Sequence, residues 1–83
     1  MAKVRLNPDA AEGFARALTG MIRRLNEALE RLEQWPKVSG AKPLRRSLKG
    51  CFRRRCGDWR IVFRPVDRDV IVIAIDNRKN VYD

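Results

Sequence analysis

Three arginines occur at spacings that would gather their guanidinium groups on one surface: Arg53, Arg55 and Arg60. The Gly57-Asp58 pair between them suits a type II′ turn, which takes glycine at its first central position and joins two antiparallel strands. Such a turn places Arg55 opposite Arg60, and strand alternation puts Arg53 on the same face. Because like charges directly opposite each other are destabilising, we interpret this face as a candidate binding site for a polyanion. The alternative interpretation is an ordinary solvated sheet face.

The opposite face of the same hairpin is mostly apolar. The predicted register assigns to it Phe52, Arg54, Cys56, Trp59, Ile61 and Phe63. We therefore expect this face to pack on the core, with Arg54 as its one charged member. Arg54 is expected either to extend its guanidinium group to the edge of the sheet or to mark a bulge that shifts the local register.

Positive charge is concentrated in one part of the chain. The 83 residues carry a formal net charge of +9, and their number predicts a single domain over residues 1–83. Residues 37–60 contain nine Lys or Arg against the single acid Asp58, whereas the signs are nearly balanced elsewhere. A basic block within a small domain is typical of nucleic-acid-binding proteins. Its members before the hairpin include Arg45, Arg46 and Lys49.

Other classes of protein are disfavoured by what the sequence lacks. The longest apolar run, residues 70–75, is far shorter than the ~20 residues of a membrane span, and no signal-like segment opens the chain. Without histidine, Cys51 and Cys56 are too few ligands for zinc, and their odd interval on one strand directs them to opposite faces. We therefore expect two reduced cysteines in a cytoplasmic protein, with no membrane contact, no metal and no other cofactor.

The hydrophobic pattern predicts which elements support the hairpin. Residues 3–6 alternate charged and apolar side chains, as in a short strand, and Asn7-Pro8-Asp9 is typical of a helix start. Apolar residues then recur at helical spacing as far as Leu32, with Gly20 as a break or a bend, and residues 37–49 are expected to form a loop. Residues 69–75 predict a strand that is apolar on both faces. This order predicts an α+β fold, with an N-terminal strand and two helices packed on one face of a small antiparallel sheet.

The combined pattern resembles the RelE/ParE superfamily of toxins from type II toxin–antitoxin systems, and within it the RelE-like branch. The resemblance covers nearly the whole chain through residues 44–55, residues 57–63 and residues 75–82. It implies the RelE-like fold and a cognate antitoxin protein as partner. RelE-like members resemble small ribonucleases that enter the ribosomal A site and cut mRNA, whereas ParE-like members inhibit DNA gyrase and lack the basic catalytic set.

The resemblance also implies a site. RelE-like toxins have two basic residues before the hairpin turn, an arginine after it, an arginine after the last long strand and a tyrosine near the end. The matching catalytic candidates here are Arg55, Arg60, Arg78 and Tyr82, with Arg53, Lys49, Arg45 and Arg46 as candidate RNA-binding residues. The implied reaction is metal-free attack of an RNA 2′-hydroxyl on the adjacent phosphate, with the ribosome and mRNA as partners and inhibition of translation as the result.

One position departs from the RelE-like pattern and keeps three functions open. Related toxins have Lys where this chain has Arg55, and a guanidinium group does not release its proton as a lysine can. The expected function is ribosome-dependent mRNA cleavage, in which Arg55 supplies charge instead of accepting a proton. The alternatives are a ParE-like gyrase inhibitor and a catalytically weak relative that binds nucleic acid or antitoxin.

Overall fold

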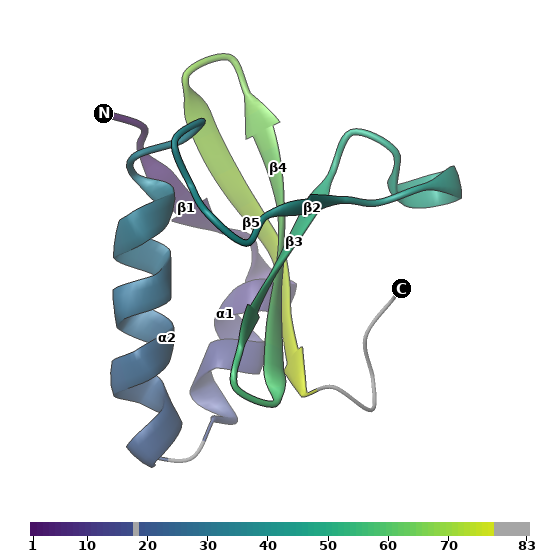
Figure 1. Ribbon diagram of the computed structural model, residues 1–83. Coiled ribbons are helices and arrows are strands. Elements are labelled where there is room, and N and C mark those ends of the chain that lie inside the picture. The colour runs from purple at the N-terminus through teal and green to yellow at the C-terminus, as the bar shows by residue number, and fades with distance from the viewer. Residues whose placement is uncertain (18, 78–83) are drawn as a thin grey trace.

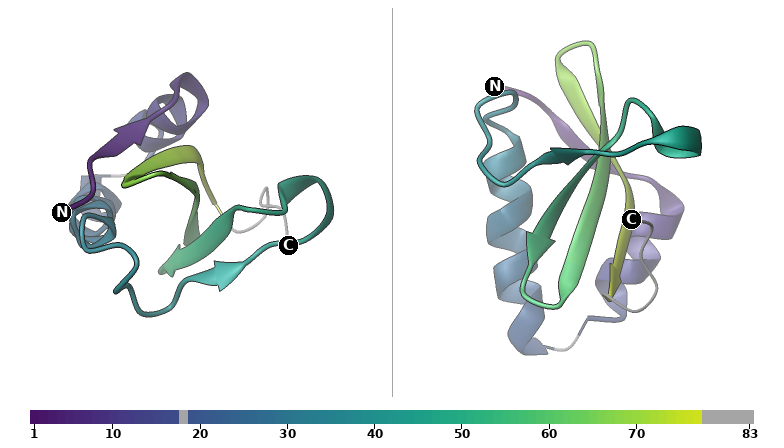
Figure 2. Two further views of the ribbon diagram at one scale, coloured as in Figure 1. Left: turned by 90° about the horizontal axis from the view of Figure 1, so that it is seen from above. Right: turned by 45° about the vertical axis from the view of Figure 1, so that its right-hand side comes forward.

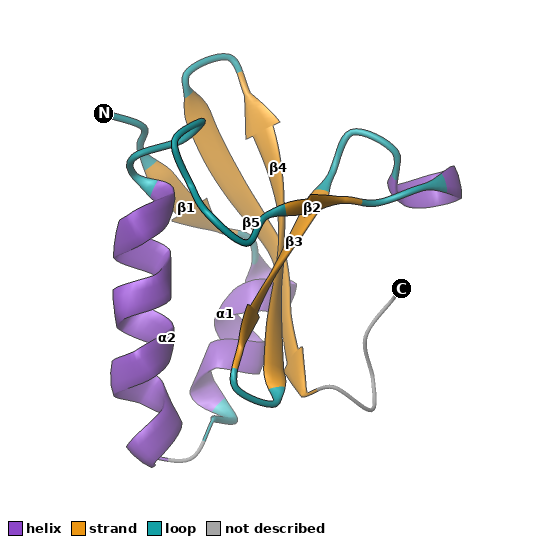
Figure 3. Ribbon diagram, in the orientation of Figure 1, coloured by secondary structure: helices purple, strands orange, loops and turns teal. Residues whose placement is uncertain are grey.

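The computed structural model describes residues 1–17 and 19–77 of the chain. These residues form helices, strands and a 3₁₀ helix, η1, around one sheet (Figures 1 and 3). In chain order the elements are β1 (Val4–Leu6), α1 (Pro8–Ala15), α2 (Thr19–Leu32), β2 (Lys42–Pro43), η1 (Arg46–Leu48), β3 (Phe52–Cys56), β4 (Trp59–Val66) and β5 (Asp69–Asn77). None of the helices formed by these residues is long and apolar enough to cross a membrane.

The strands lie in the order β1-β5-β4-β3-β2, so β1 and β2 occupy opposite edges of the sheet. The β3–β4 hairpin has the register that the sequence predicts, with Arg55 opposite Arg60 and Phe52 opposite Phe63. Gly57 has a φ of 61°, as the first central residue of a type II′ turn requires. β4 and β5 pair antiparallel as expected, but β1 pairs with β5 in parallel, so the sheet is mixed.

One hydrophobic core joins both helices to one face of the sheet. Ile61 and Phe63 of the hairpin are fully buried in it, Phe52 and Trp59 are partly buried against it, and the helices add Ala10, Leu25 and Leu32. The largest inward side chains of the sheet are Ile61, Phe63, Val70, Val72 and Ile75. Trp35 packs edge-on against Phe63, with 5.2 Å between ring centroids. The expected α+β fold, with helices on one face of a small sheet, is therefore confirmed.

Helix α1 begins where the sequence predicts. The Asn7 side-chain oxygen accepts a hydrogen bond from the Ala10 backbone N–H at 2.8 Å, which caps the helix. The helix then approaches β5 very closely, because a Cβ atom on Gly13 would lie 1.9 Å from the carbonyl oxygen of Ile75. The chain leaves α1 after Ala15, and Gly20 lies inside α2, so the break between the helices comes before this glycine.

The segment between α2 and β3 differs most from the expected loop. β2 is a two-residue strand that pairs only Lys42 with Arg53 and Pro43 with Phe52. Residues 42–50, which we call the basic arm, then turn back through η1. Backbone hydrogen bonds close this turn, from Leu44 N to the Cys51 carbonyl at 3.0 Å and from Cys51 N to the Leu48 carbonyl at 2.9 Å. The arm extends away from α2 on the far side of the sheet (Figure 2).

Candidate nucleic-acid interface

The sheet face turned away from the helices, which we call the outer face, carries the arginines of the hairpin. Arg55, Arg60 and Asp76 form one row across β3, β4 and β5. Arg55 is exposed, whereas Arg60 in the middle of the row is only 4% exposed. The predicted pair is thus brought together, but the outer face is not open at Arg60 as expected. Asp76 places an opposite charge beside Arg60, which favours this arrangement.

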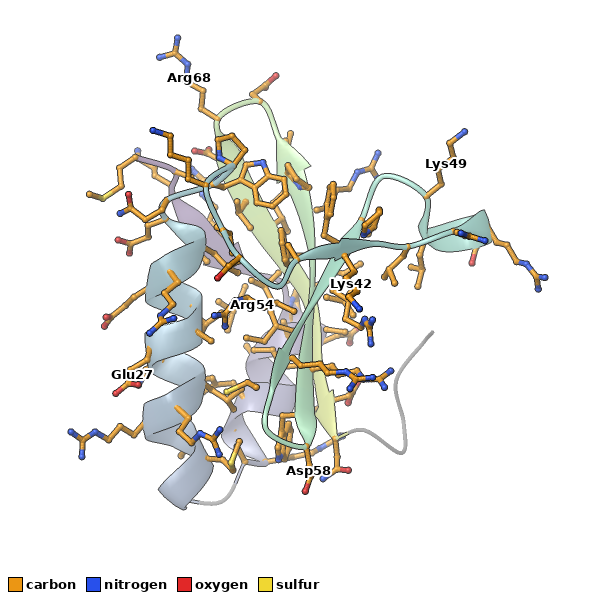
Figure 4. All side chains as sticks on the ribbon, viewed as in Figure 1. Glu27, Lys42, Lys49, Arg54, Asp58 and Arg68 are labelled. Atoms are coloured by element: carbon orange, nitrogen blue, oxygen red, sulfur yellow. The ribbon has the colours of Figure 1, made fainter. Side chains whose placement is uncertain are left out.

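Arg53 belongs to the next row, between Lys42 on β2 and Val62 on β4. Arg53 is half-buried and Lys42 is exposed. Figure 4 shows the Lys42 side chain on the side of β3 that faces away from α2. Lys42 was not expected at the site, although it belongs to the basic block of the sequence. Its place opposite Arg53 depends on β2, and a two-residue strand has no periodicity that could reveal it.

A groove of about 760 Å³ lies between the basic arm and the hairpin. Four arginines line it, Arg45 and Arg46 from the arm and Arg53 and Arg55 from β3, together with apolar surface from Leu44 and Leu48. Among the described residues that line the groove there is no acid, so the positive charges reinforce one another. Clefts lined by one sign of charge over low-dielectric walls concentrate the field that attracts a polyanion. We call this feature the arginine groove.

The backbone of the arm fixes two of these arginines. Arg46 has a φ of 59°, in the left-handed region that costs a non-glycine residue about 1 kcal/mol. Hydrogen bonds of η1, from Leu48 N to the Arg45 carbonyl at 3.2 Å and from Lys49 N to the Arg46 carbonyl at 3.0 Å, hold this conformation. Such strain is often found at functional positions. Lys49 does not line the groove and lies on the arm beyond it (Figure 4).

Arg54 takes the first of its two expected positions. Its side chain is directed toward α2 (Figure 4) and its Nε donates a hydrogen bond to the Ser39 carbonyl at 3.3 Å. The hairpin register is regular there. The irregularity lies between β4 and β5 instead, where Val62 faces Ala74 but Phe63 faces Val72, leaving Ile73 as an extra residue. An unbroken ladder would place Ile75 opposite Arg60, so this bulge brings Asp76 to the outer face.

The remaining predicted site residues, Arg78 and Tyr82, lie outside the residues that the structure describes. The described part of the site therefore consists of four arginines around one groove, with the buried Arg60 opposite Arg55 on β4. The groove forms because the basic arm folds back over the outer face. In the sequence, only the high local density of basic residues indicated that Arg45 and Arg46 belong to the site.

Solved structures of small bacterial toxins share this fold. The RelBE2 toxin–antitoxin complex from Mycobacterium tuberculosis contains a chain that is 25% identical with a TM-score of 0.80, over 93% of this chain and 98% of that chain. YafQ from E. coli is 13% identical with a TM-score of 0.81 over the whole of both chains. The isolated E. coli RelE toxin is 14% identical with a TM-score of 0.78, over 98% of this chain and 88% of that chain. The protein thus has the fold of RelE-like toxins.

Sequence similarity identifies the family to which the chain belongs. Residues 2–82 match the family described as the ParE toxin of the type II toxin–antitoxin system, parDE. The chain therefore belongs to this toxin family, within the RelE/ParE superfamily that its motifs resemble. No curated protein sequence is similar enough to count as a match. The similar RelBE2 structure is a complex of a toxin with its antitoxin.

Proposed function

We propose that this toxin inhibits translation by cleaving mRNA at the ribosomal A site, in the cytoplasm, with the RNA held in the arginine groove. The observation that carries the proposal is the convergence of Arg45, Arg46, Arg53 and Arg55 on one groove of about 760 Å³. Guanidinium groups match the geometry of phosphate and can bind it through two hydrogen bonds. A positively charged groove of this kind suits the backbone of a single-stranded nucleic acid.

In the proposed reaction the RNA supplies its own nucleophile. The 2′-hydroxyl oxygen attacks the adjacent phosphorus, and the bond from phosphorus to the 5′-oxygen of the next nucleotide breaks. The products carry a 2′,3′-cyclic phosphate and a 5′-hydroxyl. Arg53 and Arg55 stabilise the negative charge that develops on the phosphate oxygens. The 2′-hydroxyl proton passes to water or to a phosphate oxygen, because a guanidinium group is already protonated, and the leaving 5′-oxygen takes a proton from solvent.

The other candidate residues have supporting roles in this proposal. Arg60 is only 4% exposed and lies opposite Arg55, which favours an electrostatic role beside Arg55 over direct two-point contact with the phosphate. Arg78 and Tyr82 enter through the family resemblance alone, Arg78 beside the leaving oxygen and Tyr82 as a platform on which a base stacks.

Inhibition of DNA gyrase is the second candidate function. Two observations favour it: the match to the ParE toxin family, and the presence of Arg55 where a lysine could accept the 2′-hydroxyl proton. A gyrase inhibitor needs no such acceptor. A catalytically weak relative that only binds nucleic acid or antitoxin is the third candidate, and the same experiment separates all three.

The test combines primer extension on mRNA from cells that express the toxin with a gyrase supercoiling assay on purified protein. We expect new mRNA 5′ ends within translated codons and normal supercoiling. The variant Arg53→Gln/Arg55→Gln should abolish the cuts. The control Arg5→Gln/Arg68→Gln loses the same charge at exposed positions that do not line the groove, and it should cut like the parent protein.

Each other result assigns a different function. Blocked supercoiling without mRNA cuts would establish the gyrase inhibitor, and the absence of both effects would establish the catalytically weak relative. Cuts that persist in Arg53→Gln/Arg55→Gln would show that the arginine groove does not hold the scissile phosphate.

A further inference from the structure

We propose that Ser47 is a phosphorylation site, and that a phosphate on its hydroxyl binds the arginines of the arginine groove and closes the groove to RNA. Ser47 lies in η1 and lines the groove together with Arg45, Arg46, Arg53 and Arg55. This regulation rests on the proposed function for the identity of the displaced molecule, RNA, whereas binding of the phosphate by the arginines does not. Three features carry it: the place of Ser47 among the arginines, its accessibility and the charge of a phosphate.

Ser47 supplies the one side-chain hydroxyl among the described residues that line the groove. This hydroxyl makes no hydrogen bond with the described part of the chain. Within the same residues, the side chains of Arg45, Arg46 and Arg55 make neither a hydrogen bond nor an ion pair. The hydroxyl can therefore be modified, and these guanidinium groups can bind the product, without the loss of an existing contact.

A protein kinase can reach Ser47. The residue is exposed, and η1 contains no buried residue. The basic arm extends away from the sheet (Figure 2) and pairs with it through the two-residue strand β2. Because segments with few buried apolar contacts open locally at little cost in free energy, the residues around Ser47 can enter a kinase while the core stays folded. The two arginines that precede Ser47 suit a kinase whose substrate site is acidic, since kinases select substrates partly by charge.

The phosphoryl donor is a nucleoside triphosphate held by the kinase. The Ser47 Oγ forms a bond to the γ-phosphorus, the bond from that phosphorus to the oxygen that bridges it to the β-phosphate breaks, and the nucleoside diphosphate leaves. The hydroxyl proton passes to a carboxylate of the kinase. The chain then carries a phosphoserine, which has about −2 charge at neutral pH.

The charge of this phosphate is large relative to that of the groove. It cancels about half of the positive charge of the four lining arginines. A phosphate opposite an arginine cluster forms one to three charge-assisted hydrogen bonds, and a guanidinium group can bind it through two parallel bonds. Because the phosphate is tethered beside these arginines, its effective concentration is on the order of millimolar. It therefore competes with an RNA phosphate for the same groups.

Occupancy of the site is tested by phosphopeptide mass spectrometry of the chain isolated from its native host, during growth and during starvation. We expect phosphate on Ser47 in at least one of these conditions. Ser39 is the other serine of the chain and is also exposed, but it does not line the groove, and it should carry none. Unmodified Ser47 in both conditions would overturn the proposal.

The effect on RNA binding is tested with full chains that carry phosphoserine at position 47 or, as the matched control, at position 39, each incorporated through an expanded genetic code. Fluorescence anisotropy with a labelled short single-stranded RNA should show at least ten-fold weaker binding for the phosphate at position 47. The phosphate at position 39 should change affinity by less than about two-fold. The thermal unfolding midpoint checks that both chains are folded. Equal weakening in the two chains would overturn the proposal, because overall charge alone would then explain it.

A phosphorus NMR titration tests closure of the groove without RNA. Neighbouring guanidinium groups favour the dianion of a phosphate and lower its second pKa from the usual value of about 6. The phosphate at position 47 should therefore titrate at lower pH than the phosphate at position 39, and Arg45→Gln/Arg46→Gln should remove most of this difference. Equal titration of the two phosphates would overturn the proposal. Absence of mRNA cleavage by the parent protein would contradict the proposed function alone, since this titration does not depend on it.

Discussion

Arg54 and Arg55 are adjacent in sequence, but their guanidinium groups lie in different surroundings. Arg54 is directed toward α2 and donates a hydrogen bond to the Ser39 carbonyl, whereas Arg55 lines the arginine groove on the outer face. Arg60, opposite Arg55, is almost fully buried. A charge in such a position strengthens the field at its neighbour because little water screens it. The chemistry available at the groove therefore depends strongly on which basic group occupies position 55.

The first prediction concerns the change Arg55→Lys. A lysine that is flanked by other cations loses its proton more readily, so it can accept the 2′-hydroxyl proton. General-base catalysis typically contributes about 10²–10⁴-fold, and we expect single-turnover cleavage of ribosome-bound mRNA to accelerate at least ten-fold at mildly alkaline pH. Arg53→Lys, one row away, is the matched control and should not accelerate the reaction. Slower cleavage by the Arg55→Lys variant would instead show that the planar guanidinium contact is what the proposed reaction needs.

Those features of the helices and strands that depend on neighbouring residues could be predicted from the sequence. The hairpin register follows from the turn at Gly57 and from side-chain alternation, and the start of α1 follows from the Asn7 cap. Contacts between distant segments were not predictable in this way. The parallel β1–β5 pairing, the extra residue at Ile73 and the fold of the basic arm over the outer face have no local signature. Half of the arginine groove therefore came from a segment that was expected to be a loop.

The second prediction concerns the contact between α1 and β5. Gly13→Ala would place a Cβ atom 1.9 Å from the Ile75 carbonyl oxygen, which forces the helix and the strand apart. We expect a loss of about 3 kcal/mol in the free energy of unfolding, measured by urea denaturation. Gly20→Ala is the control, since nothing lies within 4 Å of its Cβ position and alanine favours a helix by up to about 1 kcal/mol. Equal stability of the two variants would contradict the close approach.

The third prediction separates strain from binding in the basic arm. Arg46→Gly removes a guanidinium group and also a left-handed backbone cost of about 1 kcal/mol, so the unfolding midpoint should not fall while affinity for a short single-stranded RNA drops several-fold. Asp67→Gly relieves the same backbone conformation, at a φ of 56° in the β4–β5 turn, and should leave RNA affinity undiminished. The combination of fluorescence anisotropy and denaturant unfolding measures both properties. RNA binding by Arg46→Gly at the parental level would exclude the arm from the interface.

Positive charge is distributed unevenly over the whole molecule. Most of the net charge of +9 lies on the basic arm, β3 and the start of β4, whereas the far edge of the sheet, at β1, contributes little of it. Opposite edges of the sheet therefore present different electrostatic surfaces. Only the arginines that converge on a groove are expected to hold a polyanion closely, and the remaining cations steer its approach.

The fourth prediction measures how many charges take part. Four groove arginines that each neutralise one phosphate predict a slope of about −3 for the logarithm of RNA affinity against the logarithm of salt concentration. Arg45→Gln/Arg46→Gln should roughly halve this slope, which anisotropy titrations at several salt concentrations will show. A much steeper slope that the variant leaves unchanged would indicate diffuse binding over the whole basic surface instead of one groove.

The arginine groove lies on one face of β3, a strand that is one polypeptide thick. Arg54 and Arg55 share a peptide bond, with Cα atoms ~3.8 Å apart, while their side chains diverge to opposite faces. A carboxylate that neutralises Arg54 from the helix side also lowers the positive potential on the far side, because the space between the two charges is filled by protein, which screens charge less than water does. An inhibitor could thus weaken this toxin from behind, without ever entering the cleft where RNA would be held.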